Sequence, residues 1–135
     1  MKSTNLSKVK NRAFWAIAAL IALYSSFLLC RYIFFALHGM KEYPFDLFLF
    51  GLVIIIIAVI FNWKKSMIFT VTGYLGGFAV GILFNTDGIG QGGGQTNNAW
   101  IIWTISFVVI VFIGIIIELA SGRLKKKISD KASGR

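Results

Sequence analysis

The strongest constraint on this chain is a series of four long apolar runs separated by short polar breaks. The runs cover about residues 13–37, 45–61, 67–84 and 99–120. An α-helix rises about 1.5 Å per residue, so roughly 20 apolar residues cross a hydrocarbon core of about 30 Å. Backbone groups in lipid have no water to bond, so each run has to satisfy its own hydrogen bonds as a helix. The pattern predicts four transmembrane helices.

Two further features favour an all-α integral membrane protein. The strands of a membrane β-barrel alternate apolar and polar residues, whereas residues 52–61 (LVIIIIAVIF) are apolar throughout. Hydrophobic residues make up 57% of the chain and charged residues only 14%. The basic tails at 1–12 and 121–135 and a flexible outer loop at 85–98 are too short to build a soluble core. We therefore expect residues 1–135 to form a single four-helix domain in the bilayer.

Positive charge is distributed unevenly over the polar breaks. The net charge is +9, and 12 of the 14 basic residues precede the first run, separate the second from the third, or follow the fourth. They are Lys2, Lys8, Lys10, Arg12, Lys64, Lys65, Arg123, Lys125, Lys126, Lys127, Lys131 and Arg135. Only Arg31 and Lys41 fall on the opposite side of the predicted spans. By the positive-inside rule, we expect an antiparallel up-down bundle in the plasma membrane with both termini cytoplasmic.

The basic C-terminal tail has two interpretations. We expect residues 123–127 (RLKKK) to act as an orientation signal that lies solvated at the lipid headgroups. The alternative is recruitment of an anionic lipid or an acidic partner, since each Lys or Arg near a negative leaflet gains about 1 kcal/mol. Nucleic acid is not an expected partner, because no aromatic residue lies among these basic residues to stack a base.

Small residues form stripes on two of the predicted helices. The stripe in the third run recurs every four residues and consists of Gly73, Gly77 and Gly81. A stripe with the same spacing in the first run consists of Ala18, Ala22 and Ser26. Helices in lipid associate through packing and interhelical hydrogen bonds, so close approach depends on such stripes. We expect the two stripes to pack together within the molecule, with self-association or contact with a foreign helix as the alternative.

Ionisable residues are scarce within the runs. Arg31 lies near the outer end of the first run, and Asp46 begins the second run on the same side. We expect Arg31 to form a structural ion pair with Asp46, or with Glu42, at the outer interface, with a ligand or ion site as the alternative. Glu118, in the last turn of the fourth run, is expected to be an interface carboxylate with basic neighbours. No run carries a carboxylate at its centre, which argues against a proton-coupled exporter.

The sequence lacks the usual catalytic constellations. A catalytic zinc site takes three protein ligands, commonly histidines, and the chain has one histidine, His38, which we expect to be a solvated loop residue. Thiol redox chemistry needs a pair of cysteines, and Cys30 is alone. We therefore expect no enzyme activity, no cofactor and no metal site.

Two other features have structural interpretations. All four tryptophans fall at predicted membrane interfaces, where their amphipathic rings serve as anchors; they are Trp15, Trp63, Trp100 and Trp103. The loop at 85–98 has five glycines in residues 88–94, which predicts a mobile connector. Its G-x-G-x-x-G spelling is discounted, because a dinucleotide site needs a preceding strand and a following soluble helix. Binding of an anion or a peptide by exposed loop amides is the alternative.

Two functions of different class remain for such a chain. The first is a non-catalytic accessory or interaction subunit that packs against another membrane protein, or against itself, through small-residue helix faces. The alternative is a small transporter or channel whose pore forms in a homo-oligomer. A pore needs a continuous polar stripe along a helix. The polar residues of the third and fourth runs each cover only half of the membrane; they are Ser66, Thr70, Thr72, Thr104 and Ser106. We favour the accessory subunit.

Overall fold

The computed structural model describes residues 2–89, 91, 93 and 95–134 as a set of long helices with one short β-hairpin. Its elements are α1 (Lys2–Leu28), the π-helical segment η1 (Leu29–Ile33), α2 (Phe35–His38), α3 (Tyr43–Phe61), α4 (Lys64–Leu83), β1 (Asp87–Ile89), β2 (Gln95–Asn97) and α5 (Ala99–Ser133). Within the described residues, four helices are long and apolar enough to cross a membrane. This confirms the prediction of a helical chain with four potential spans.

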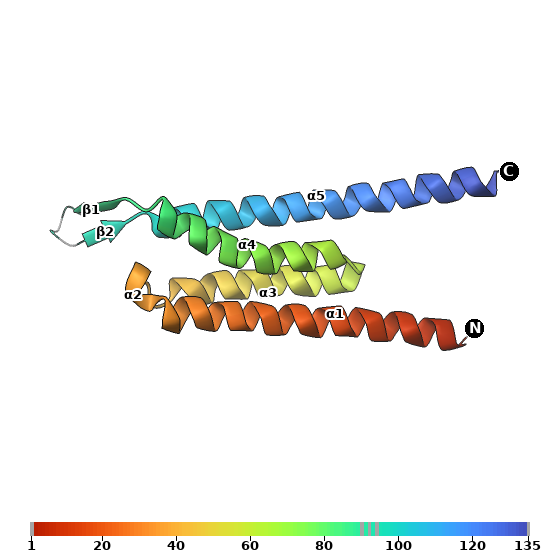
Figure 1. Ribbon diagram of the computed structural model, residues 1–135, viewed down its shortest axis with the longest axis horizontal. Coiled ribbons are helices and arrows are strands. Elements are labelled where there is room, and N and C mark those ends of the chain that lie inside the picture. Colours follow the sequence, from red (N-terminus) through yellow and green to blue (C-terminus); the bar gives the residue numbers. More distant parts are fainter. Residues whose placement is uncertain (1, 90, 92, 94, 135) are drawn as a thin grey trace.

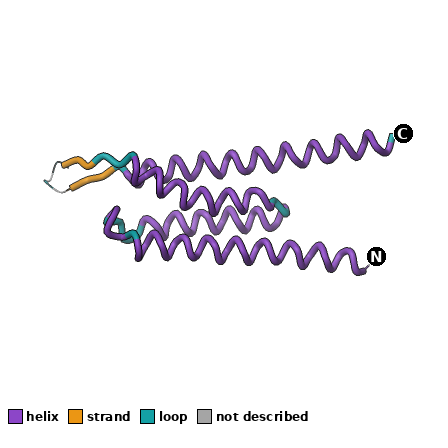
Figure 2. Tube along the Cα trace, in the orientation of Figure 1, coloured by secondary structure: helices purple, strands orange, loops and turns teal. Residues whose placement is uncertain are grey.

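Figure 1 shows the long helices side by side, with both ends of the chain at one end of the molecule. We call this the terminal end; it also holds the α3–α4 turn at residues 62–63. The opposite end, which we call the hairpin end, holds α2 and the β1–β2 hairpin (Figure 2). α4 lies against α1, α3 and α5, and its contact with α5 is the most extensive.

The first helix ends earlier than the apolar run suggests. Phe34 donates its backbone N–H to the carbonyl of Leu29 at 2.9 Å, so the helix passes into a wider π-helical turn before it breaks at Phe34. The short α2 follows, and Gly39 ends it with a φ of +65°, a left-handed conformation that glycine adopts without steric cost. The candidate span therefore closes at Ile33 rather than at residue 37.

A two-residue turn joins α3 to α4. Asn62 adopts a left-handed conformation (φ +57°), and its N–H bonds to the carbonyl of Val59 at 3.2 Å. Trp63 N–H reaches the carbonyl of Ala58 at 2.7 Å. These two bonds form a Schellman motif, which satisfies the last carbonyls of α3 and reverses the chain without a loop. Asparagine is the residue besides glycine that most readily takes this conformation.

The predicted basic tails are helical. α1 already begins at Lys2, and α5 continues to Ser133, which makes it 35 residues long. At about 1.5 Å per residue α5 measures roughly 50 Å, well beyond the 30 Å of a hydrocarbon core. The basic residues of its last third therefore lie on a rigid extension of the helix rather than on an irregular tail.

The segment at 85–98 also has more structure than its glycine content suggests. β1 and β2 pair in an antiparallel register, with Asp87 opposite Asn97 and Ile89 opposite Gln95. Asn98 closes the base of the hairpin by accepting the N–H of Thr86 on its side-chain oxygen at 2.8 Å. The expected connector is thus a short β-hairpin in its described part, in which Gly88 also takes part in the pairing, opposite Thr96.

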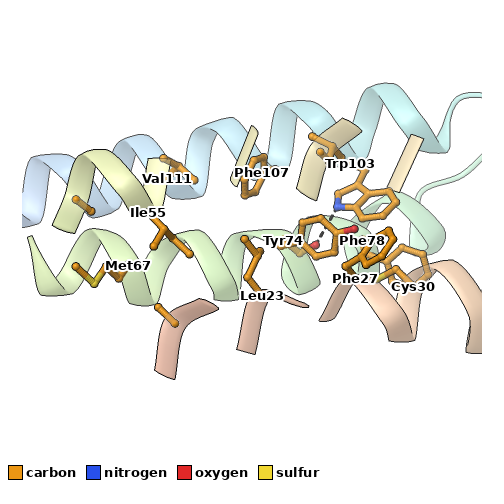
Figure 3. Close-up of a cluster of buried hydrophobic side chains, with 13 residues drawn as sticks. Leu23, Phe27, Cys30, Ile55, Met67, Tyr74, Phe78, Trp103, Phe107 and Val111 are labelled. Carbon is orange, nitrogen blue, oxygen red and sulfur yellow. Dashed lines mark hydrogen bonds between the residues drawn. The ribbon is translucent and has the colours of Figure 1, made fainter. Parts of the chain in front are cut away.

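The core runs along α4 and contains the largest side chains of the neighbouring helices. Fully buried residues include Leu23 of α1, Ile55 of α3, Tyr74 of α4, and Trp103 and Phe107 of α5 (Figure 3). Large apolar side chains also cover the outer surfaces of the helices; Ile60 is 63% exposed and Phe112 is 62% exposed. Exposed apolar surface of this extent suits a molecule whose surroundings are lipid.

Candidate functional site

The glycine stripe of α4 lies in close contact with α5. A Cβ atom placed on Gly77 would lie 2.9 Å from Cδ1 of Trp103 and 3.0 Å from its carbonyl oxygen. One placed on Gly81 would lie 2.9 Å from the carbonyl oxygen of Ala99. Gly73 meets the side chain of Ile110, where a Cβ would have 3.2 Å. The stripe therefore lets the backbone of α5 approach that of α4, as small residues do between membrane helices.

The alanine–serine stripe of α1 is not the partner of these glycines. Ser26 is buried and returns its hydroxyl to the carbonyl of Ala22 at 2.7 Å, while Ala18 is exposed. The alanines face a different side of α4 and leave a groove of about 230 Å³ between the two helices. Its walls are almost wholly apolar and consist of Trp15, Ala18, Ala19, Ala22, Met67, Ile68, Val71 and Thr72. The structure thus pairs the glycine stripe with α5 and leaves part of the alanine stripe uncovered.

Side chains from the two outer helices cap the α3–α4 turn. Arg12 of α1 donates from its guanidinium to the carbonyl oxygens of Val59 and, at 2.6 Å, Ile60, which are among the last four residues of α3. Glu118 of α5 accepts the backbone N–H of Lys65 at 2.6 Å, in the first turn of α4. Helix ends leave such groups without partners, and the helix dipole favours a cation at the C-terminus and an anion at the N-terminus. Both charges are placed accordingly.

Lys64 and Lys65, at the same turn, reach the outer helices in opposite directions. The ammonium of Lys65 donates to the hydroxyl of Ser121 on α5 at 2.5 Å. The ammonium of Lys64 donates to the side-chain oxygen of Asn11 on α1 at 3.1 Å and lies 5.9 Å from the centroid of the Trp15 ring. Glu118 therefore has a basic neighbour, as expected. Its carboxylate accepts the backbone N–H of Lys65, whereas the Lys65 ammonium donates to Ser121.

His38 is buried at the hairpin end, which corrects the expectation of a solvated loop residue. Its Nδ1 accepts the N–H of Met40 at 2.9 Å, which leaves Nε2 to carry the proton and donate to the carbonyl of Cys30 at 2.8 Å. The ring packs edge-on against Phe78 and Trp103, and only 4% of the residue is exposed. With both nitrogens engaged in hydrogen bonds, His38 closes the η1–α2 segment onto α4 and α5.

Trp103 is a core residue rather than an interface anchor. It is 1% exposed and donates its indole N–H to the carbonyl of Tyr74 at 2.9 Å (Figure 3). Tyr74 in turn donates its hydroxyl to the carbonyl of Pro44 at 2.7 Å. Tyr43 reaches the carbonyl of Trp100 at 3.0 Å and the hydroxyl of Thr104. These aromatic residues join α3, α4 and α5 with their polar atoms satisfied.

Arg31 does not form the expected ion pair. Within the described residues its guanidinium makes no ion pair with Asp46 or Glu42, and its Nη1 is buried without a hydrogen-bond partner. Asp46 is exposed, in the first turn of α3. Arg31 instead lines a second cleft, of about 210 Å³, together with Tyr32, Phe35 and Lys41.

Comparisons with known proteins add no family. No protein-family model, curated protein or solved structure matches the chain. Within the described ranges, no three His, Cys, Asp or Glu side chains gather closely enough to hold a metal ion.

Sequence reasoning missed the capping roles of Arg12 and Glu118. Glu118 carried a usable signal, because a carboxylate at the end of an apolar run needs a donor nearby. Arg12 carried none, since its position before the first run is equally typical of an orientation signal. The burial of His38 was also without a signal, because its contacts with the carbonyl of Cys30 and with the rings of Phe78 and Trp103 follow from the tertiary packing.

Proposed function

We propose that this protein is a multi-pass protein of the plasma membrane, with four helices crossing as an antiparallel up-down bundle and both termini in the cytoplasm. Support comes from the two chain ends, which lie together at the terminal end in Figure 1, and from Lys64 and Lys65, which begin α4 directly after the α3–α4 turn at that end. Arg31 and Lys41 are the basic residues of the opposite end. This asymmetry follows the positive-inside rule if the terminal end is cytoplasmic.

Within that topology the protein is a non-catalytic interaction subunit, and the open groove between α1 and α4 is the observation that carries this proposal. Its occupant is an apolar transmembrane helix of another membrane protein. The glycine stripe is already filled by α5, whereas Ala18 and Ala22 line the open groove and are small residues at which a further backbone can approach closely. A lipid tail gains little from leaving bulk lipid, whereas a helix gains interhelical packing.

The dimensions and chemistry of the groove fit a helix. Its α1 wall runs from Trp15 to Ala22, which corresponds to about 10 Å, or two helical turns. Thr72, the hydroxyl-bearing residue among those lining it, already donates its hydroxyl to the carbonyl of Ile68 at 2.8 Å. The walls therefore offer mainly apolar packing, and the matching face of the partner is apolar.

Purification in mild detergent from its native membrane, followed by mass spectrometry, tests this proposal. We expect a reproducible membrane-protein companion that cross-links to a photoreactive residue placed at Ala18. Ala22→Leu should remove the companion by filling the groove, whereas Ala120→Leu, the same change on an exposed face of α5, should retain it. A homo-oligomer that conducts ions in liposomes would replace the proposal with a small channel. A companion that survives Ala22→Leu would also contradict it.

A further inference from the structure

The surroundings of Arg31 leave its charge uncompensated by the protein. The residue lies in η1 at the hairpin end and is partly buried. Its Nη1 has no acceptor among the described residues, and the nearest described partner is the Tyr32 ring, whose centroid lies 5.9 Å from Cζ. A cation–π contact at that distance is weak compared with the cost of withdrawing a guanidinium nitrogen from water. An arginine so placed calls for an anionic partner.

Lys41 adds a second positive charge to the same cleft. It lies in the connection between α2 and α3 and lines the cleft of about 210 Å³ together with Arg31, Tyr32 and Phe35. No carboxylate lines this cleft, and Glu42, the next residue along the chain, is exposed. The cleft is therefore electropositive, with two basic side chains and two aromatic walls.

Phosphate-type anions suit this arrangement. A guanidinium offers a planar fork of N–H donors that matches two phosphate oxygens, and an ammonium adds a mobile point charge. The aromatic walls lower the local dielectric constant, which strengthens the attraction between the charges.

We propose that the Arg31–Lys41 cleft binds a phosphate-type anion at the end of the molecule opposite the chain termini. This site is separate from the α1–α4 groove and does not depend on the interaction-subunit proposal. The anion comes either from the headgroup of an acidic phospholipid in that leaflet or from free phosphate. The two aromatic residues that line the cleft, Tyr32 and Phe35, are 68% and 36% exposed and supply apolar surface for the acyl chains of a lipid.

Native mass spectrometry of the full-length protein in detergent provides the test. The probes are phosphatidylglycerol, diacylglycerol with the same acyl chains, and inorganic phosphate. We expect one tightly held phosphatidylglycerol, no comparable binding of diacylglycerol, and a loss of about ten-fold in affinity for the acidic lipid in the Arg31→Gln/Lys41→Gln variant. Lys125→Gln/Lys126→Gln removes the same charge from the exposed end of α5 and should keep that lipid bound.

Further arms separate the two sources and the role of the fold. Inorganic phosphate that binds the wild type, and whose binding the cleft variant loses, identifies free phosphate as a ligand. If inorganic phosphate neither binds nor competes, and lipid binding is still lost in the cleft variant, then the lipid headgroup is the ligand. Lys41→Gln alone changes an exposed loop residue, so we expect it to lower the affinity for phosphatidylglycerol several-fold without unfolding the protein. Equal binding of phosphatidylglycerol and of phosphate by the cleft variants and the tail variant would overturn the proposal.

Discussion

Two contacts of α4 show how differently small residues can be used. Against α5, the glycines at 73, 77 and 81 meet large rings and a backbone that fill the space they leave. At the contact with α1, the small residues belong to α1 instead. The α4 side chains that face them leave a groove of about 230 Å³ unfilled. A stripe of small residues with the right spacing therefore does not by itself close a helix contact, because the facing helix also has to fill the space that the stripe leaves.

The largest loss of stability is expected from removing the side chain of Trp103, which fills the α4–α5 interface. Trp103→Ala deletes a ring that is 1% exposed and packed against Tyr74 and Phe78, together with its hydrogen bond to the Tyr74 carbonyl. We expect a loss of roughly 3–5 kcal/mol in the free energy of unfolding, measured by titration with denaturing detergent. Trp100→Ala, three residues earlier and 47% exposed, is the control and should lose far less. Equal losses would contradict a core role for Trp103.

A smaller effect is expected from adding a single methyl group to the glycine stripe. Gly77→Ala would place Cβ 3.0 Å from the backbone oxygen of Trp103, and backbone cannot rotate away as a side-chain tip does. We expect a loss of about 1–3 kcal/mol in the same unfolding assay. Gly76→Ala is a matched control on the next residue, where the added atom meets Ile110 at an ordinary 3.6 Å. It should be neutral or stabilising by up to about 1 kcal/mol, because alanine favours helix.

The caps of the α3–α4 turn sharpen the comparison at the terminal end. Glu118 joins α5 to the N-terminal turn of α4 there, whereas Arg12 joins α1 to the C-terminal turn of α3. The closely packed α4–α5 pair is therefore also the pair joined by a charged side chain at a helix N-terminus. Glu118→Ala should cost about 1–2 kcal/mol by leaving the Lys65 N–H without its acceptor. Asp130→Ala removes the same charge from the exposed end of α5 and should change stability little. A similar loss in both variants would assign the effect to net charge.

The existence of four helices of membrane-spanning length was predictable because the requirement is local. A run such as 52–61 has to be helical in lipid whatever it contacts. The partner of the glycine stripe was not predictable in the same way. Gly77 and Ala22 belong to stripes of equal spacing in the sequence, and the spacing does not tell which helix, here α5 with Trp103 and Phe107, fills the glycine stripe.

The candidate sites show the same division between local and long-range information. Arg31 was identified from its position, because a charge within an apolar run is conspicuous. Its lack of an ion pair with Asp46 depends on the π-helical turn at Leu29–Ile33, for which the sequence carries no pattern. The bond between Glu118 and Lys65 joins residues 53 positions apart, so it follows from the packing of α5 on α4 and not from spacing.

The smallest change in stability is expected at the open contact, which makes it the sharpest test of the comparison. Ala22→Leu adds three carbon atoms to a helix face that lines an unfilled groove, so no neighbour has to move. We expect a change within about 0.5 kcal/mol in the detergent-unfolding assay, as for surface substitutions. A loss comparable to that of Gly77→Ala would mean that α1 and α4 close in the membrane and that no partner helix can enter. Unchanged stability together with loss of the companion protein would separate two roles of small residues. The glycines at the α4–α5 contact would then stabilise the fold, and the alanines at the α1–α4 groove would bind the partner.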